Sequence, residues 1–210
     1  MNFFKKKYKS RTSKDDGHII ITGTGRSGTT LLVQYFTYLG FDTGYSLRQV
    51  STDVDPISHA GLERPLIDEG NPYVIKSPWF AETLSEALAN NRIRIHAAIL
   101  PMRDLFQAAE SRRHITRSGT DAGGLWLTDK PEEQEAILAG QFYKALYPLI
   151  EHGIQVYLIH FPRFVSEPDT LYDSMKRLHA EHGVSREESQ RALIKVARLD
   201  RIHSFTPSIE

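Results

Sequence analysis

The sequence contains no cysteine, which excludes disulfides, thiolate metal sites and a cysteine nucleophile. It has no excess of either charge, because 26 Lys and Arg residues balance 26 Asp and Glu residues. A nucleic-acid-binding domain usually has a basic excess, so this class of function is disfavoured. No apolar run reaches the roughly 20 residues of a membrane-spanning helix, and no apolar stretch of a secretory signal follows the basic residues 1–9. We therefore expect a cytoplasmic protein without a transmembrane segment.

The composition is that of a globular protein, with 40% hydrophobic and 25% charged residues. A chain of 210 residues suits one domain with a sizeable core. We expect a basic, flexible arm at residues 1–17 and a single α/β domain at residues 18–210. The nine histidines show no clustered metal-ligand pattern such as H-E-x-x-H, so no metal site is predicted. The sequence leaves the oligomeric state open.

Short apolar runs alternate with helical patterns along the chain. Residues 19–21 are three isoleucines without polar alternation, which is typical of a central parallel strand buried on both faces. Strands are expected at residues 19–21, 71–76, 94–100 and 154–159. Helices are expected at residues 31–39, 56–63, 77–90, 104–115, 131–152, 169–182 and 186–198. This alternation predicts a P-loop-type α/β fold of three layers, with helices flanking a parallel sheet and a ligand at the carboxyl ends of its strands.

Proline and serine set two of the expected helix boundaries. Within the otherwise irregular residues 41–71, Asp55 and Pro56 are expected to open a brief helix, with the proline at its first position. Ser77 is expected to cap the next helix, again with a proline, Pro78, in the first helical position.

A glycine-rich segment at residues 23–30 follows the first strand and precedes the first helix. Its pattern, Gly-x-x-x-x-Gly-Thr-Thr, has the outline of a P-loop, but Thr29 stands where that loop has lysine. The glycines allow successive backbone N–H groups to face an anion, and the helix N-terminus adds positive potential. Kinases use the missing lysine to hold the β- and γ-phosphates, so a triphosphate donor is disfavoured. Arg26, inside the loop, can supply a cation instead.

Two motifs resemble those of the sulfotransferase family. Residues 25–32, Gly-Arg-Ser-Gly-Thr-Thr-Leu-Leu, are similar to its 5′-phosphosulfate loop, a basic residue followed by Ser-Gly-Thr-Thr or Ser-Gly-Ser-Thr. Arg103 at a strand end and Ser111 eight residues later are similar to its 3′-phosphate element, although Leu105 replaces the usual proline. A fainter likeness after the fourth strand extends the resemblance to about residues 18–183.

The resemblance implies transfer of a sulfuryl group from 3′-phosphoadenosine-5′-phosphosulfate to a hydroxyl of a small-molecule, glycan or lipid acceptor. The product would be adenosine 3′,5′-bisphosphate, and no metal would be required. By resemblance, the donor site consists of Gly25, Arg26, Ser27, Gly28, Thr29, Thr30, Arg103 and Ser111.

The chemistry needs cations at the leaving oxygen and a base at the acceptor. By resemblance, Lys76 would stabilise the transferred group, together with Arg26. The base is open between Glu63 and His59, which a helix over residues 56–63 would place on one face; we favour Glu63. Five aromatic residues could line an acceptor cleft or pack in the core: Tyr45, Tyr73, Trp79, Phe80 and Trp126.

Two other functions stay open. A P-loop kinase of small molecules would use Asp104 as a Mg²⁺ ligand, against the threonine at the lysine position. A catalytically inactive nucleotide-binding domain of the same fold would have lost its base, and the irregular residues 41–71 leave room for that interpretation. Basic residues outside the motifs are expected on a solvated helix face: Arg112, Arg113, His114 and Arg117.

Overall fold

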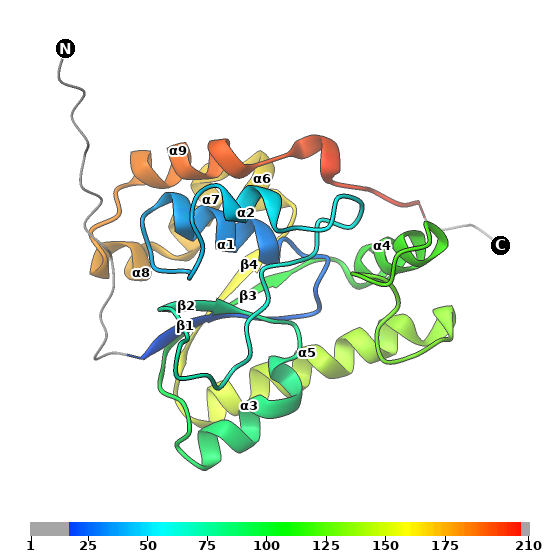
Figure 1. The fold of residues 1–210 in the computed structure, drawn as a ribbon, viewed down its shortest axis with the longest axis horizontal. Helices are drawn as coiled ribbons and strands as arrows, with labels where there is room; N and C mark the ends of the chain where they lie inside the picture. Colours follow the sequence, from blue (N-terminus) through cyan, green and yellow to red (C-terminus); the bar gives the residue numbers. More distant parts are fainter. Residues whose placement is uncertain (1–16, 207–210) are drawn as a thin grey trace.

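A computed structural model describes residues 17–206 of the chain, so the expected basic arm lies outside the described residues except for Gly17. The four predicted strands form one parallel sheet (Figure 1). They are β1 (His18–Ile21), β2 (Val74–Lys76), β3 (Ile95–Met102) and β4 (Gln155–His160). The spatial order is β2-β1-β3-β4, so the strand that leads into the glycine-rich loop is central.

Helices cover both faces of this sheet (Figure 1). One face carries α1 (Thr29–Tyr38), α6 (Arg163–Ser166), α7 (Pro168–Ser174), α8 (Lys176–Glu181) and α9 (Arg186–Val196). The opposite face carries α3 (Phe80–Ala89) and α5 (Gln134–Glu151), which follows the 3₁₀ turn η1 (Pro131–Glu133). Outside these two layers are α2 (Gln49–Thr52) beside α1, α4 (Leu105–Arg117) beyond the carboxyl end of β3, and the 3₁₀ turn η2 (Leu199–Arg201). The three-layer α/β prediction is confirmed. Within residues 17–206, no helix is both long and apolar enough to cross a membrane.

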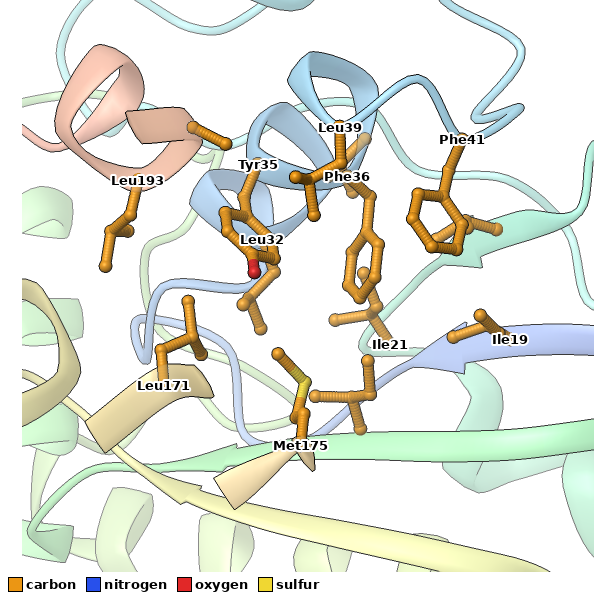
Figure 2. Packing of buried hydrophobic residues seen from close by; sticks show 14 of the residues in the cluster. Ile19, Ile21, Leu32, Tyr35, Phe36, Leu39, Phe41, Leu171, Met175 and Leu193 are labelled. Atoms are coloured by element: carbon orange, nitrogen blue, oxygen red, sulfur yellow. The ribbon is translucent and has the colours of Figure 1, made fainter. Parts of the chain in front are cut away.

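The isoleucines of β1 explain why this strand has no polar alternation. Ile19 and Ile21 point into the core beneath α1 and α9, whereas Ile20 points into the core over α3 and α5, and all three are fully buried. On the first side, Tyr35 and Phe36 of α1 pack against these strand residues (Figure 2). Full burial stabilises the fold by about 1.5–3 kcal/mol for each such side chain. The core therefore fixes β1 and α1, and with them the loop that joins the two elements.

The segment that precedes β2 differs from the sequence prediction. The brief helix is α2, at Gln49–Thr52, and residues 56–63 form turns. One oxygen of the Asp55 carboxylate accepts the N–H groups of Ile57 and Ser58, which closes a tight turn. His59 and Leu62 have φ angles of 56° and 67°, which a right-handed helix does not allow. The expected helix at 56–63 is therefore wrong.

Two further helix boundaries also differ. The helix α3 begins at Phe80 instead of following Ser77 directly, because the Ser77 hydroxyl accepts the N–H of Trp79 at 3.1 Å in a turn that comes before the helix. The expected helix at 169–182 is divided into α7 and α8 at Met175, whose φ and ψ of −117° and 23° are not helical. The side chain of Met175 is fully buried at that break.

Candidate active site

The glycine-rich loop leaves the N-terminus of α1 open. The loop turns through positive φ angles at Gly23, Gly25, Arg26 and Gly28. Gly28 caps α1 without a side chain, and the first helical turn holds no acidic residue. A Cβ atom on Gly28 would lie 2.8 Å from the Phe161 ring, so the close packing requires glycine. The backbone N–H groups of residues 29–31, in the first turn of α1, have no acceptor among the described residues. Such open N–H groups at a helix N-terminus are the arrangement that binds anions.

Arg26 connects the loop to two distant segments. Its Nε donates to Ser111 Oγ at 3.0 Å, and its NH1 donates to the backbone carbonyl of Ser58. Burial, and then the nearby Arg103, lower the pKa of Arg26 to about 10. The Asp55 carboxylate partly offsets this lowering but forms no salt bridge with the guanidinium, so a bound anion would further offset the cost of its burial.

Arg103 and Ser111 both hydrogen-bond to Arg26. Arg103 follows β3 directly and donates from NH1 to the Arg26 carbonyl at 3.1 Å and from NH2 to the His203 carbonyl. Its Nε is buried without a partner in the described part of the chain, and burial lowers its pKa. Asp104, the residue that a kinase would use for Mg²⁺, caps α4 by accepting the Gln107 N–H at 2.9 Å.

A cavity of about 260 Å³ opens beside these residues, and its lining is strongly basic. None of the described residues that line it is acidic. The lining includes the basic side chains of Arg26, Arg103, Lys195, Arg198 and Arg201, together with His59 and His203. We name this space the donor cavity. Its charge favours a polyanionic ligand.

The C-terminal segment supplies part of the donor cavity that the sequence analysis missed. Lys195 lies on α9, and the segment after it runs across to α4 (Figure 1). Gln107 on α4 fixes that segment by donating to the Phe205 carbonyl at 2.6 Å and by accepting the Phe205 N–H at 2.9 Å. The signal in the sequence is the regular spacing of Lys195, Arg198 and Arg201, three residues apart, which is equally typical of a solvated helix face.

Lys76 lies on the other side of the loop. It is the last residue of β2, and its side chain is 3% exposed. Its Nζ donates to the Gly61 carbonyl at 2.9 Å and to Thr30 Oγ1 at 3.3 Å, and it forms a salt bridge with Glu63. Burial lowers the pKa of Lys76, and the Glu63 carboxylate counteracts that change.

The structure separates the two candidate bases. Glu63 contacts Lys76, and its side chain is 37% exposed. His59 lines the donor cavity instead, where burial, Arg201 and Arg26 lower its pKa. The two residues share no helical face, because the segment between them is not helical.

Residues 54–62 form an arch over the glycine-rich loop. An antiparallel bridge joins Val54 to Gly61. The Ser58 carbonyl accepts from Arg26, and the Gly61 carbonyl accepts from Lys76 and, at 3.4 Å, from the Thr30 hydroxyl. The first part of the arch, with Ser58 and His59, lines the donor cavity. Ala60 and Gly61 line a second cavity of about 390 Å³. Arg26, Thr29 and Thr30 line both cavities, so the start of α1 is their common wall.

Arg112 lines the second cavity. Its expected position on a solvated helix face is wrong. It is 5% exposed and donates at 2.7 Å to the carbonyls of Thr24 and Gly124. Its guanidinium lies over the Trp126 ring, 5.0 Å from the centroid. Burial and the charge of Arg26 lower its pKa to about 9. Arg112 therefore ties the start of the glycine-rich loop to the segment before α5.

The sequence matches no protein-family model and no curated protein. Among solved structures, the chain is similar to a sulfotransferase domain from the curacin biosynthetic pathway, with 16% identity, a TM-score of 0.52, and coverage of 90% of this chain and 81% of that one. A sulfotransferase domain from the olefin synthase of Synechococcus PCC 7002 also aligns, with 11% identity, a TM-score of 0.49, and coverage of 91% of this chain and 85% of that one. The chain therefore has a sulfotransferase-like α/β fold.

Proposed function

We propose that this protein is a sulfotransferase that uses 3′-phosphoadenosine-5′-phosphosulfate as its donor. The observation that carries the proposal is the donor cavity, in which five Lys and Arg side chains and no acidic one line a space beside the open N-terminus of α1. This donor carries a 5′-phosphosulfate and a 3′-phosphate, so it needs cations at two separate points. The fold likeness to a sulfotransferase domain supports the same proposal.

The residues present suit both anionic ends of the donor. The open N–H groups at the start of α1, with Thr29 and Thr30, suit the 5′-phosphosulfate. The Ser27 hydroxyl is buried without a partner in the described residues, but Ser27 is fully buried and lines neither cavity. Arg103 and Ser111 suit the 3′-phosphate, with Arg26 joined to both by hydrogen bonds.

In the reaction, the acceptor oxygen forms a bond to sulfur while the bond from sulfur to the bridging 5′-phosphate oxygen breaks. The electron pair stays on that phosphate oxygen, and the acceptor proton moves to the Glu63 carboxylate. Lys76 lies between Glu63 and Thr30, so its ammonium can stabilise charge at the leaving oxygen. Glu63 suits the base better than His59, because it lines the second cavity with Lys76, whereas His59 lines the donor cavity.

Binding of the product tests the donor before any acceptor is known. Adenosine 3′,5′-bisphosphate at 100 times its Kd would stabilise the fold by about 2.7 kcal/mol, which raises the Tm of a domain of this size by roughly 5–10 °C. Adenosine 5′-monophosphate, which lacks the 3′-phosphate, should produce a clearly smaller shift. A larger shift with ATP and Mg²⁺ than with the bisphosphate would favour the kinase and overturn this proposal, as would no shift with the bisphosphate at saturation.

A further inference from the structure

The second cavity contains both tryptophans of the chain. Trp79 and Trp126 meet edge to face, with ring centroids 5.3 Å apart and an interplanar angle of 89°. Trp79 is 50% exposed and Leu127 is 51% exposed. The other apolar residues that line this cavity are Ala60, Pro78, Ala122 and Leu125. Exposed aromatic and aliphatic side chains that line a cavity beside charged groups are typical of a ligand site.

The two rings are held in different ways. Trp126 is 4% exposed and packs with Ala108 and Ala109 of α4 and Leu138 of α5. The Gln134 side chain accepts the backbone N–H of Trp126 at 2.7 Å and donates to the backbone carbonyl of Trp126 at 3.2 Å. Trp79 lies in the turn between β2 and α3, three residues after Lys76. The cavity therefore has one rigid aromatic wall and one exposed aromatic side chain that a ligand can cover.

The cationic side chains in this cavity already have partners within the protein, whereas the Asp121 carboxylate, which also lines it, has no side-chain partner among the described residues. Arg112 donates to two carbonyls, Arg26 donates to Ser111 and to a carbonyl of the arch, and Lys76 is paired with Glu63. A sugar ring presents several hydroxyl groups, and each of them needs a polar partner once it is buried. A ring with a single hydroxyl needs only the free oxygen of the Glu63 carboxylate.

We propose that the second cavity binds a neutral aromatic or alicyclic alcohol, with its ring against Trp79 and Leu127 and its hydroxyl at Glu63. Lys76 contacts both Glu63 and Thr30, so a hydroxyl at Glu63 lies beside the start of α1, where the donor cavity begins. This inference rests on the proposed function for the role of the alcohol as acceptor. The chemical class of the ligand follows from the cavity alone.

The two tryptophans also supply the test, because both residues line this cavity and each has one indole N–H signal. In ¹⁵N–¹H spectra of the full chain, titration with p-cresol or cyclohexylmethanol should shift both indole signals, and N-acetylglucosamine at equal concentration should shift neither. Trp79→Ala should weaken p-cresol binding roughly three- to tenfold, as expected for the loss of an aromatic contact, with the Trp126 indole as reporter. Trp79→Phe should restore most of the affinity, and Tyr143→Ala, which removes a 64% exposed ring of α5, should change nothing.

The proposal is overturned if p-cresol shifts neither indole signal, if N-acetylglucosamine binds as tightly as p-cresol, or if Trp79→Ala binds p-cresol as the wild type does. Trp79 is half exposed, so its alanine variant should fold. If that variant does not fold, Trp79→Phe, which keeps an aromatic ring, is compared with the wild type instead. The donor is absent from these titrations. If p-cresol binds but adenosine 3′,5′-bisphosphate does not stabilise the fold, the proposed function is contradicted. The ligand class proposed for the second cavity is then still supported.

Discussion

Arg26 donates from Nε to the Ser111 hydroxyl at 3.0 Å, although 85 positions separate the two residues. The same arginine accepts NH1 of Arg103 on its backbone carbonyl. The elements that the sequence indicates for two different phosphates are thus joined in a single hydrogen-bonded group.

We expect Arg103→Ala to weaken the binding of adenosine 3′,5′-bisphosphate by about 10- to 100-fold. A hydrogen bond to a charged group contributes about 1.5–3 kcal/mol, and each 1.4 kcal/mol corresponds to a factor of ten. Ser111→Ala should have a smaller effect in the same direction. Isothermal titration calorimetry with the bisphosphate and with adenosine 5′-monophosphate measures both effects.

The loss should be specific to the 3′-phosphate, so the monophosphate should bind the variants nearly as well as it binds the wild type. Arg117→Ala on α4 is the control, because its side chain is 65% exposed and pairs with Glu110. Equal losses for both nucleotides in Arg103→Ala would contradict the assignment of Arg103 to the 3′-phosphate.

Glu63→Gln should lower kcat by about 10²- to 10⁴-fold, the usual contribution of a general base. The Kd of the bisphosphate should stay within a few-fold of wild type, because Glu63 lines the second cavity and not the donor cavity. The measurement is transfer of labelled sulfate to a ring alcohol that binds the second cavity. Glu82→Gln, an exposed carboxylate of α3, should retain full activity. If His59→Gln lowered kcat and Glu63→Gln did not, the base would be wrongly assigned.

Gly25→Ala should destabilise the fold by about 1–3 kcal/mol, the range for a strained backbone residue. Gly25 has a φ of 66°, and a Cβ atom on it would lie 2.6 Å from NH2 of Arg112. The control is Gly140→Ala in α5, where a Cβ atom meets nothing within 4 Å and should stabilise the protein by about 0.4–1 kcal/mol. Urea unfolding of both variants measures the difference. Equal stability of the two variants would show that the loop relaxes around the new side chain.

The sequence predicts the elements whose signals are local. The run of isoleucines in β1 and the glycines after it lie within one strand and one loop, and the eight residues from Arg103 to Ser111 span only the end of β3 and the first turns of α4, so pattern and spacing suffice. The convergence of these motifs also follows from parallel strands, whose carboxyl ends meet at one edge of the sheet.

The arch is not readable from the sequence, because its conformation depends on distant partners. His59 and Leu62 adopt left-handed φ angles without being glycine. The carbonyls of Ser58 and Gly61 are held by Arg26 and Lys76, which belong to other elements. Proline and aspartate at its start are equally compatible with a helix N-terminus, and only the contacts of the folded chain decide between the two.

Arginines that pack against the protein are just as hard to distinguish from solvated ones, and Arg113, expected on a solvated face, is only 12% exposed. Arg112 and Arg113 are neighbours on α4, yet the first is buried against the Trp126 ring and the second pairs with Glu110 and Glu135. Helical periodicity gives the direction of each side chain relative to the other. It does not say which direction faces protein, because the segment that covers Arg112 comes from the loop before α5.

Binding of adenosine 3′,5′-bisphosphate should take up protons near pH 6.5. Burial lowers the pKa of His59 and of His203 below 6.5, with further lowering by Arg201 and Arg26 at His59 and by His114, Arg26 and Arg103 at His203. Without ligand, both groups contribute stability above about pH 6.5 that is lost as the pH falls through their lower folded-state pKa values. A bound anion favours the imidazolium form and raises both pKa values, so affinity should increase as the pH falls through this window.

Calorimetry at pH 6.5 in buffers of different ionisation enthalpy measures the protons exchanged on binding. His59→Gln and His203→Gln should each reduce the uptake, whereas His152→Gln, at the exposed C-terminal end of α5, should not. A phosphate group has a second pKa near 6 and would lose its proton in a basic site, which gives release instead of uptake. Net release that is the same in wild type and in both variants would therefore show that neither histidine faces the bound nucleotide.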